Sequence, residues 1–264
     1  MFSAFTTVFH VRGYELREDG RIGHATFVQW FEEAAIQASA ALGYDLAKYH
    51  ALNAAWVIRD LDVEFLDSPR YGEPVEVTTW VSDFRRIRSH REYQARRANG
   101  GELLARGRAE WIFLDLQTMR PRRLSPEMVA SFETNSIPAL EPMDWPAFES
   151  GESLGQWEAT RCVQNYEIDQ MQHVNNVVYL NWIEQHAREA WVAWERDPAA
   201  LRLRRHYIQF RQAAQDGDLL RVVTDTARVA GSVIWRHQIL RGDTLLVEAR
   251  SVDQTSLQPS RVAV

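Results

Sequence analysis

The chain has 264 residues, of which 45% are hydrophobic and 25% are charged, and its formal net charge is −6. This composition is that of an ordinary globular protein, so it excludes the disordered and fibrous classes. No apolar run approaches the length of a membrane-spanning helix, and the acidic balance argues against a general nucleic-acid-binding protein. The first residues lack the pattern of a secretory signal, and the single cysteine, Cys162, cannot form an intramolecular disulfide. We therefore expect a cytoplasmic location.

The first half of the chain predicts one long helix followed by strands. Apolar residues recur at helical spacing from Phe27 to Leu42, and Gly43 fits the position just after a helix end. Strand-like alternation follows over residues 75–81 and 106–115, with a hairpin-turn sequence, NGGE, at 99–102. A long helix followed by an antiparallel meander is an α+β unit in which the sheet wraps the helix.

The middle of the chain predicts a break between domains. From Pro126 to Gln156 there is no Lys or Arg, and prolines recur among Ser and Glu. Because proline fixes φ and removes a backbone donor, such a stretch resists regular structure. We predict an N-terminal domain over residues 1–130, a linker over 131–156 and a C-terminal domain over 157–264. Trp145 and Phe148 are the residues through which we expect the linker to pack on the surface.

The second half repeats the order of the first. The segment ATFVQWFEEAA begins at Ala25 and VVYLNWIEQHA at Val177, an offset of 152. Further along, VEFLDSPRYGEPVEV begins at Val63 and IQFRQAAQDGDLLRV at Ile208, an offset of 145. A second helix and strands are expected over 180–194, 220–229 and 231–240, with a turn at RGDT (241–244). Two matches in one order at nearly one offset indicate a tandem duplication, and two such units can pair through their sheets.

The densest polar cluster is YEIDQMQHVNNVVYLNW, residues 166–182. Asp169 and His173 lie four residues apart, just before a helix that we expect to begin at Asn175 or Asn176. A carboxylate beside an imidazole can activate a water molecule, and the unpaired N–H groups of a helix start can stabilise an oxyanion. The structural alternative is an ordinary helix cap with a hydrogen-bonded turn, since Asn and Asp are common N-caps.

The duplication helps to decide between a catalytic pair and an ordinary helix cap. At the offset of 152, Asp169 falls on Arg17 and His173 falls on Arg21, so the first copy lacks both groups. A cluster that only started a helix could be used equally by either copy. Its restriction to the second copy predicts one catalytic half and one binding half.

The sequence resembles the acyl-acyl carrier protein (acyl-ACP) thioesterases of plants and bacteria, which are double hotdog proteins. Their signature, Asp-x-Asn-Gln-His-Val-Asn-Asn, matches residues 169–176 at all but one defined position. AWVIRDLDVEF (55–65), YGEPVEVTTWV (71–81) and RAEWIFLDLQTMRPRRLSPEMV (108–129) also read like the family's N-terminal half. The resemblance implies tandem hotdog domains. It also implies hydrolysis of the thioester of fatty acyl-ACP, which releases a free fatty acid and ends chain elongation in fatty acid biosynthesis.

The resemblance also implies roles for individual residues. Asp169 and His173 take the positions of the family's catalytic Asp and His. Asn175 and Asn176, at the helix start, would position the substrate and stabilise the oxyanion. The first half would hold the acyl chain, and the candidates for the wall of that site are Trp30, Trp56 and Trp111.

Two positions depart from the family's pattern. The family's Asn is Met171 here, and its Glu, in a Tyr-Arg-Arg-Glu-Cys-like strand, is Ala213, with Ala214 at the Cys position. A thioether and a methyl group cannot polarise a carbonyl or accept a proton. Gln170 and Gln212 are neighbours, but in extended backbone they would point to the opposite face. Either the mechanism uses only Asp169, His173 and helix N–H groups, or a neighbouring side chain takes the role of a missing group.

The remaining expectations concern cofactors, partners and rival functions. Histidine spacing shows no metal motif and no glycine-rich phosphate loop follows a strand, so we expect no metal and no cofactor. We expect Cys162 to be a buried structural thiol. The implied partner is acyl carrier protein bearing a fatty acyl chain, and a homodimer is one option. The alternatives are an acyl-CoA thioesterase and a weakly active or non-catalytic acyl-thioester-binding protein, the latter favoured by Met171 and Ala213.

Arginine clusters leave a further choice open. All but one of the 30 basic residues are arginine, the exception being Lys48. The clusters are Arg85, Arg86, Arg88 and Arg91; Arg120, Arg122 and Arg123; and Arg202, Arg204 and Arg205. We expect solvated strand edges and turns, and the alternative is a docking surface for the acidic carrier protein.

Overall fold

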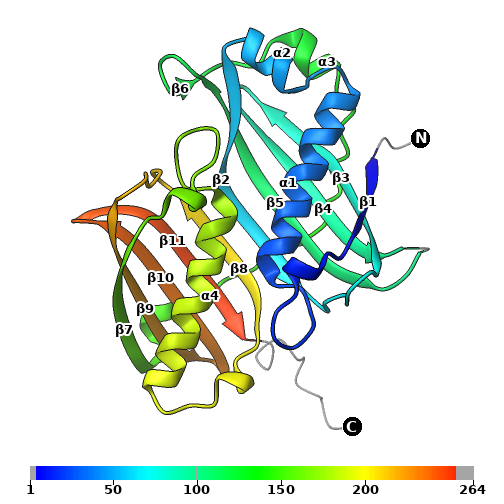
Figure 1. Cartoon of the computed structure of the whole chain (residues 1–264). Coiled ribbons are helices and arrows are strands. Elements are labelled where there is room, and N and C mark those ends of the chain that lie inside the picture. The colour runs from blue at the N-terminus through cyan, green and yellow to red at the C-terminus, as the bar shows by residue number, and fades with distance from the viewer. Residues whose placement is uncertain (1–3, 99, 254–264) are drawn as a thin grey trace. The chain divides into compact units, whose positions relative to one another are not determined.

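The computed structural model describes residues 4–98 and 100–253, and it separates into two compact units, Met1–Glu141 (unit 1) and Pro142–Val264 (unit 2). In each unit one long helix lies across a face of an antiparallel sheet (Figure 1). The predicted α+β class is therefore confirmed. The boundary between the units falls inside the predicted linker. The expected NGGE turn includes Asn99, which lies outside the described residues.

Unit 1 is an antiparallel sheet with the strand order β1-β3-β4-β5-β2, and β6 pairs with β5. Its elements in chain order are β1 (Phe5–His10), the 3₁₀ turn η1 (Gly13–Glu15), α1 (His24–Ala41), α2 (Leu46–Ala51), β2 (Ala54–Phe65), β3 (Pro74–Arg85), β4 (Arg88–Arg97), β5 (Leu103–Asp115), β6 (Arg120–Pro121) and α3 (Pro126–Ala130). The long helix α1 packs on β1, β3 and β4.

Helix α1 buries small and aromatic side chains against its sheet. Phe31 is 1% exposed and its ring stacks on that of Tyr93 in β4, with 5.0 Å between the ring centroids. Gly107 of β5 allows this approach, because a Cβ there would lie 3.4 Å from the Phe31 ring and 3.2 Å from a backbone oxygen of β2. The helix ends as predicted: Leu42 is the C-cap, and Gly43 follows with a left-handed φ of 82°.

Unit 2 repeats the arrangement with the strand order β8-β11-β10-β9-β7, again antiparallel. Its elements are η2 (Phe148–Ser150), β7 (Glu152–Cys162), η3 (Asn165–Glu167), α4 (Asn176–Ala193), η4 (Pro198–Ala200), β8 (Leu203–Phe210), β9 (Leu219–Val229), β10 (Ser232–Arg241) and β11 (Thr244–Asp253). Among the described residues of both units, no helix combines the length and apolarity needed to cross a bilayer.

The two units share backbone detail at the predicted offset of 152. Each long helix has 18 residues, and each is preceded by a 3₁₀ turn at the same distance. Between turn and helix, a single antiparallel bridge joins Leu16 to Ile22 in unit 1 and Ile168 to Val174 in unit 2. The duplication inferred from the sequence therefore extends to the loop that carries the polar cluster.

The helix–sheet interface of unit 2 is filled by indole rings. Trp235 of β10 is fully buried, and its ring centroid lies 5.4 Å from that of Trp191 and 6.0 Å from that of Trp194, both at the end of α4. Trp157 of β7 packs against the same cluster. These four side chains, the tryptophan cluster, hold the last turn of α4 on its sheet.

The predicted linker, residues 131–156, is packed against the two units. In unit 1 the backbone N–H of Ala139 donates to the buried carboxylate of Glu92, at 3.0 Å. In unit 2 Trp145 and Phe148 pack against a buried cluster on β9, β10 and β11, as the sequence predicts. Strand β7 begins at Glu152, inside the predicted linker.

Candidate active site at the start of α4

A tight turn presents Asp169. The N–H of Gln172 donates to the backbone oxygen of Asp169 at 3.0 Å, and Gln172 has a left-handed φ of 63°. The side chain of Asp169 accepts from the N–H of Met171 at 2.7 Å, and its own N–H donates to the backbone oxygen of His173 at 2.9 Å. The backbone is therefore not extended here, so strand alternation does not determine where Gln170 and Met171 point.

The carboxylate of Asp169 and the imidazole of His173 lie together as the sequence predicts. Their closest atoms, Oδ1 of Asp169 and Nδ1 of His173, are 3.5 Å apart, and the side chains are 24% and 20% exposed. This separation is longer than a hydrogen bond but within the range of an ion pair. The pair is therefore partly shielded from bulk solvent, but part of each side chain stays accessible.

Helix α4 begins at Asn176, and its cap uses some of the N–H groups that an oxyanion would need. The side chain of Asn175 accepts from the N–H of Val177 at 2.9 Å, and its backbone oxygen accepts from Val178 at 3.0 Å. The expected helix start is confirmed, and Asn175 acts as the N-cap. Within the described residues the N–H of Asn176 has no acceptor, so this first-turn amide remains available to a substrate.

A buried carboxylate that the sequence analysis missed supports this loop. Glu167, 7% exposed, accepts from Arg161 at 2.7 Å, from the indole of Trp182 at 2.9 Å and from the N–H of Gln164 at 2.9 Å. The Arg161 guanidinium also lies 3.9 Å from the centre of the Trp182 ring. This network ties β7, η3 and α4 together. The signal that could have found it is Glu15, the residue at the same place in the first copy.

The segment that holds the family's Glu and Cys positions also lies beside the loop. The N–H of Val174 donates to the oxygen of Ala214 at 2.9 Å, and the N–H of Ala214 donates to the hydroxyl of Tyr179 at 2.9 Å. Ala213 is exposed, so this segment brings a methyl group where the family has a carboxylate. Strand β8 ends before it, at Phe210, so the expectation that Gln212 points to the opposite face of a strand does not apply.

Tyr179 is a second residue that the sequence analysis missed. It is 2% exposed, and burial raises the pKa of its hydroxyl to about 12, with nearby Asp218 and Asp169 acting in the same direction. The phenol therefore stays protonated at neutral pH. Its hydroxyl accepts from Ala214 and keeps one proton to donate.

The three tryptophans expected in the acyl-chain site have different surroundings. Trp30 is 2% exposed and stacks on Phe9 of β1, with 5.5 Å between ring centroids. Trp56 and Trp111 lie on β2 and β5 and are half-buried. Their indoles donate to tyrosine hydroxyls, Trp56 to Tyr49 at 3.2 Å and Trp111 to Tyr93 at 3.1 Å. Their role in binding an acyl chain stays a prediction.

Cys162 does not have the burial that the sequence analysis predicts. Cys162 ends β7 as a strand residue, but its side chain is exposed, so the expectation of a buried thiol is wrong. The reason is its place at the strand end, beside the turn at Gly217.

In the first copy, Arg21 replaces His173 and pairs with Asp67 at 2.6 Å, so the matching loop of unit 1 makes a structural ion pair.

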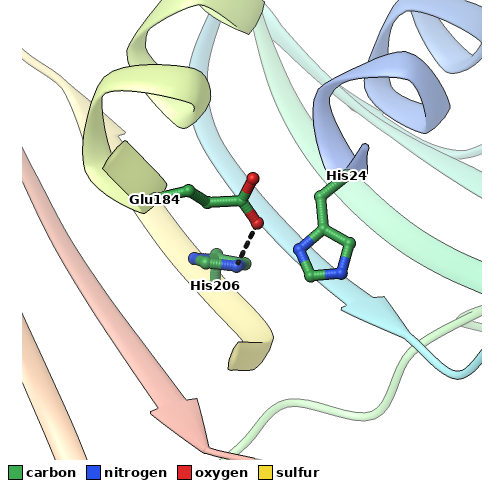
Figure 2. Close-up of side chains that lie close together, drawn as sticks. All are labelled: His24, Glu184 and His206. Carbon is green, nitrogen blue, oxygen red and sulfur yellow. Dashed lines mark ion pairs between the residues drawn. The ribbon is translucent and has the colours of Figure 1, made fainter. Parts of the chain in front are cut away.

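Unit 2 also contains buried polar groups under α4. His206 accepts or donates a 2.8 Å hydrogen bond with Ser251, and His237 a 3.0 Å hydrogen bond with Thr224. Glu184 of α4 lies 3.8 Å from Nε2 of His206 (Figure 2). Within unit 2 this pair offers one imidazole nitrogen and one carboxylate oxygen, whereas a structural zinc site takes four such ligands.

A long helix on an antiparallel sheet, present twice in tandem, with a carboxylate and an imidazole before the second helix, defines a double hotdog protein of the thioesterase class. Residues 3–132 match the family model described as the acyl-ACP thioesterase N-terminal domain, and residues 156–253 match that of the C-terminal domain. The chain belongs to the acyl-ACP thioesterase family.

Individual relatives and solved structures are also similar to this chain. The chloroplastic palmitoyl-acyl carrier protein thioesterase of Arabidopsis thaliana is 26% identical over 193 residues, which cover 69% of this chain and 47% of that protein. The chain spans about half the length of the curated relatives it matches. Two solved structures share the fold. A Lactobacillus plantarum protein assigned as an oleoyl thioesterase has a TM-score of 0.79 at 21% identity, covering 97% of this chain and 98% of that one. An acyl-ACP thioesterase from Bacteroides thetaiotaomicron has a TM-score of 0.75 at 18% identity, covering 94% and 97%.

Proposed function

We propose that this protein hydrolyses the thioester that joins a fatty acyl chain to acyl carrier protein, releasing a free fatty acid. The observation that carries the proposal is the 3.5 Å approach of Asp169 to His173 beside the start of α4. Membership of the acyl-ACP thioesterase family and the name of the Arabidopsis relative support it. Acyl carrier protein is then the partner that delivers the substrate, and the cytoplasmic location and the homodimer stay predictions.

The chemistry follows from three groups. The thioester carbonyl lies near the N–H of Asn176, which stabilises the negative charge that develops on its oxygen. Asp169 removes a proton from the attacking water, or attacks the carbonyl itself to give a mixed anhydride that water then opens. His173 orients Asp169 or the attacking water, or protonates the departing thiolate. Helix α4 adds the positive end of its dipole to the same place.

The test is fatty-acid release from a panel of acyl-ACP esters by the wild type and by Asp169→Asn. Loss of an acid–base group should lower kcat/KM by at least about 100-fold. Asp19→Asn is the matched control, because Asp19 is a carboxylate in the corresponding turn of unit 1 and accepts from the N–H of Arg21 at 3.1 Å. It should leave the rate unchanged. An unchanged rate in Asp169→Asn would remove Asp169 from the mechanism.

A second candidate, a binding protein for acyl thioesters, is favoured by one observation. The positions of two catalytic groups of the family hold Met171 and Ala213, and neither side chain can take part in proton transfer. Parallel assays with acyl-ACP and acyl-CoA of the same chain separate the outcomes. Faster release from the carrier protein supports the proposal, faster release from CoA favours an acyl-CoA thioesterase, and tight binding without release favours the binding protein.

A further inference from the structure

The structure separates the arginine clusters of the sequence into buried and exposed residues. Arg91 on β4 and Arg205 on β8 are each only 8% exposed, so the expectation of solvated strand edges and turns is wrong for these two. Arg86, Arg120 and Arg123 are exposed, and no carboxylate among the described residues forms an ion pair with them. Three positive charges therefore remain available at the surface of unit 1.

Two arginine clusters that are far apart in the sequence meet at one end of unit 1. The N–H of Leu124 donates to the backbone oxygen of Arg86 at 2.9 Å, so the segment after β6 lies against the turn between β3 and β4. Strand β6 itself pairs with β5, which places Arg120 opposite Asp115. The same end of unit 1 carries α2 and α3 (Figure 1). Arg86, Arg120 and Arg123 therefore belong to one surface rather than to two.

The segment that carries Arg120 and Arg123 is held in place by hydrogen bonds within unit 1. The carboxylate of Asp115 accepts from the N–H and the hydroxyl of Thr118, at 2.9 and 3.0 Å. The guanidinium of Arg122 donates to the backbone oxygen of Leu52 at 2.6 Å. A surface whose backbone is already fixed loses less conformational entropy when a partner binds.

An apolar side chain lies beside these arginines. Met119 directly precedes Arg120 and is 52% exposed, and its N–H donates to the backbone oxygen of Asp115 at 2.8 Å. Methionine and arginine are both enriched at protein–protein interfaces, and the flexible methionine side chain adapts to the shape of a partner. We call Arg86, Met119, Arg120 and Arg123 the basic surface.

The carboxylates near the basic surface have partners of their own. Glu110 pairs with Arg88, and Asp83 lies 2.9 Å from His90. The carboxylate of Asp115 is bound by its own turn. The basic surface therefore keeps its positive charge, although the chain as a whole has a net charge of −6. An acidic partner is attracted to this surface and repelled by most of the rest, so charge determines where the partner binds.

We propose that the basic surface of unit 1 is the docking site for the acidic face of acyl carrier protein. This rests on the proposed function, which makes the carrier protein the partner that delivers the thioester. The exposed guanidinium groups pair with carboxylates of the carrier protein, and Met119 packs against an apolar side chain among them. A membrane is less suitable as the anionic partner, because clusters that bind anionic lipids have about 4–8 basic residues.

The first test measures docking without hydrolysis. The probe is acyl carrier protein whose pantetheine arm carries a dodecanoyl group through an amide in place of the thioester. Arg120→Glu/Arg123→Glu should weaken its binding at least about 10-fold, because several exposed ion pairs are lost and reversed. Met119→Asn should weaken it as well, and asparagine tolerates the left-handed φ of 53° at this position.

The control for the double variant is Arg70→Glu/Arg228→Glu. Both residues are exposed, Arg70 before the start of β3 and Arg228 on β9, and the change in net charge is the same. This control should change the affinity for the carrier protein far less. An equal loss of affinity in the control would show that total charge alone matters, and this would overturn the proposal.

Steady-state kinetics separates a docking defect from a folding defect. With dodecanoyl-ACP, Arg120→Glu/Arg123→Glu should raise KM at least about 10-fold and keep kcat, as expected when only binding is lost. With dodecanoyl-pantetheine, which has no carrier protein, kcat/KM should equal that of the wild type. Salt at about 1 M, where the Debye length is about 3 Å, should remove the difference between variant and wild type. Equal losses with both substrates would overturn the proposal.

Vesicles of phosphatidylglycerol test the other anionic partner. Binding to them that is lost in Arg120→Glu/Arg123→Glu, while carrier protein binding is unchanged, would assign the basic surface to a membrane and overturn the proposal. The docking site and the hydrolase assignment fail in different ways. If the carrier protein binds through this surface but no thioester is hydrolysed, the docking site stands and the hydrolase falls. If dodecanoyl-ACP is hydrolysed equally by variant and wild type, the hydrolase stands and the docking site falls.

Discussion

The main-chain N–H of Ala214 donates a 2.9 Å hydrogen bond to the hydroxyl of Tyr179. Tyr179 lies in the first turn of α4, and Ala214 follows the end of β8, so the bond joins the helix to a loop from another part of unit 2. The same loop accepts from Val174, the residue after His173. One buried phenol therefore helps to fix the backbone on both sides of the candidate site.

Tyr179→Phe should lower both stability and rate. The change leaves the N–H of Ala214 buried without an acceptor, which costs about 1–3 kcal/mol in the free energy of unfolding. The loop beside Asp169 should loosen, and kcat should fall by about 10-fold, since misplacement of catalytic groups is expensive. Denaturant unfolding and steady-state kinetics measure the two effects. Tyr166→Phe is the control, because Tyr166 is 84% exposed; a matching fall in kcat there would contradict the explanation.

Glu167→Gln should slow the reaction although the residue touches no substrate. The amide cannot accept from Arg161, Trp182 and Gln164 as the carboxylate does. The loss of a buried charged acceptor should cost about 2–4 kcal/mol in the free energy of unfolding. We expect kcat to fall more than KM changes, because the network positions the loop that carries Asp169.

The duplication supplies the control for this variant. Glu15 is the counterpart of Glu167, is 8% exposed and accepts from Arg12 at 2.6 Å. Glu15→Gln should destabilise the protein by a similar amount, of the order of 2 kcal/mol, but should leave kcat intact. Equal losses of kcat in both variants would mean that lower stability alone explains the effect of Glu167→Gln.

The stability of unit 2 should fall as the pH falls below about 6. Burial lowers the pKa of His237 to about 3, with the nearby His206 and His186 acting in the same direction. In the unfolded chain its pKa is about 6.5. Below that pH the unfolded state binds a proton that the folded state excludes, so the free energy of unfolding drops by about 1.4 kcal/mol per pH unit down to about pH 3.

Urea unfolding at several pH values measures this dependence. His237→Gln keeps a hydrogen-bonding group for Thr224 and removes the titration, so the slope below about pH 6 should become shallower by about one proton. His50→Gln changes an exposed histidine and should leave the slope as it is. A slope unaffected by His237→Gln would show that other groups cause the acid sensitivity.

Cys162 should react in the native protein. Its side chain is exposed at the end of β7, so a thiol reagent such as Ellman's reagent should modify it without denaturant. Cys162→Ser should retain full activity, because the residue lies outside the turn that carries Asp169 and His173. Slow modification that requires urea would contradict the described exposure, and loss of activity in the serine variant would assign the thiol a role.

The sequence predicts the two long helices and the Asp169–His173 pair because these depend on local rules, whereas α2 was not predicted and α3 (Pro126–Ala130) lies in a stretch that was expected to be irregular. Helical spacing and the cap at Asn175 determine where α4 starts, and a four-residue separation across a turn brings two side chains together. The internal duplication adds long-range information, since two similar segments predict two units of similar structure.

The surroundings of the site could not be predicted in the same way. The bond between Tyr179 and Ala214 joins residues 35 positions apart, and it depends on where β8 ends. The burial of Arg91 was also missed, because four nearby arginines read as a surface cluster whichever face each one occupies. Which side of a strand meets the helix is set by register and by bulges, such as the one near Val81 in β3.

The tryptophan cluster gives unit 2 its own optical signature. The rings of Trp194 and Trp235 lie nearly parallel, at 22° and 6.0 Å between centroids, close enough for their excited states to couple. The exciton band in circular dichroism arises from coupled indole rings, so it can follow the loss of this stack during denaturation. The order in which the duplicated halves come apart thus becomes measurable in the unlabelled protein.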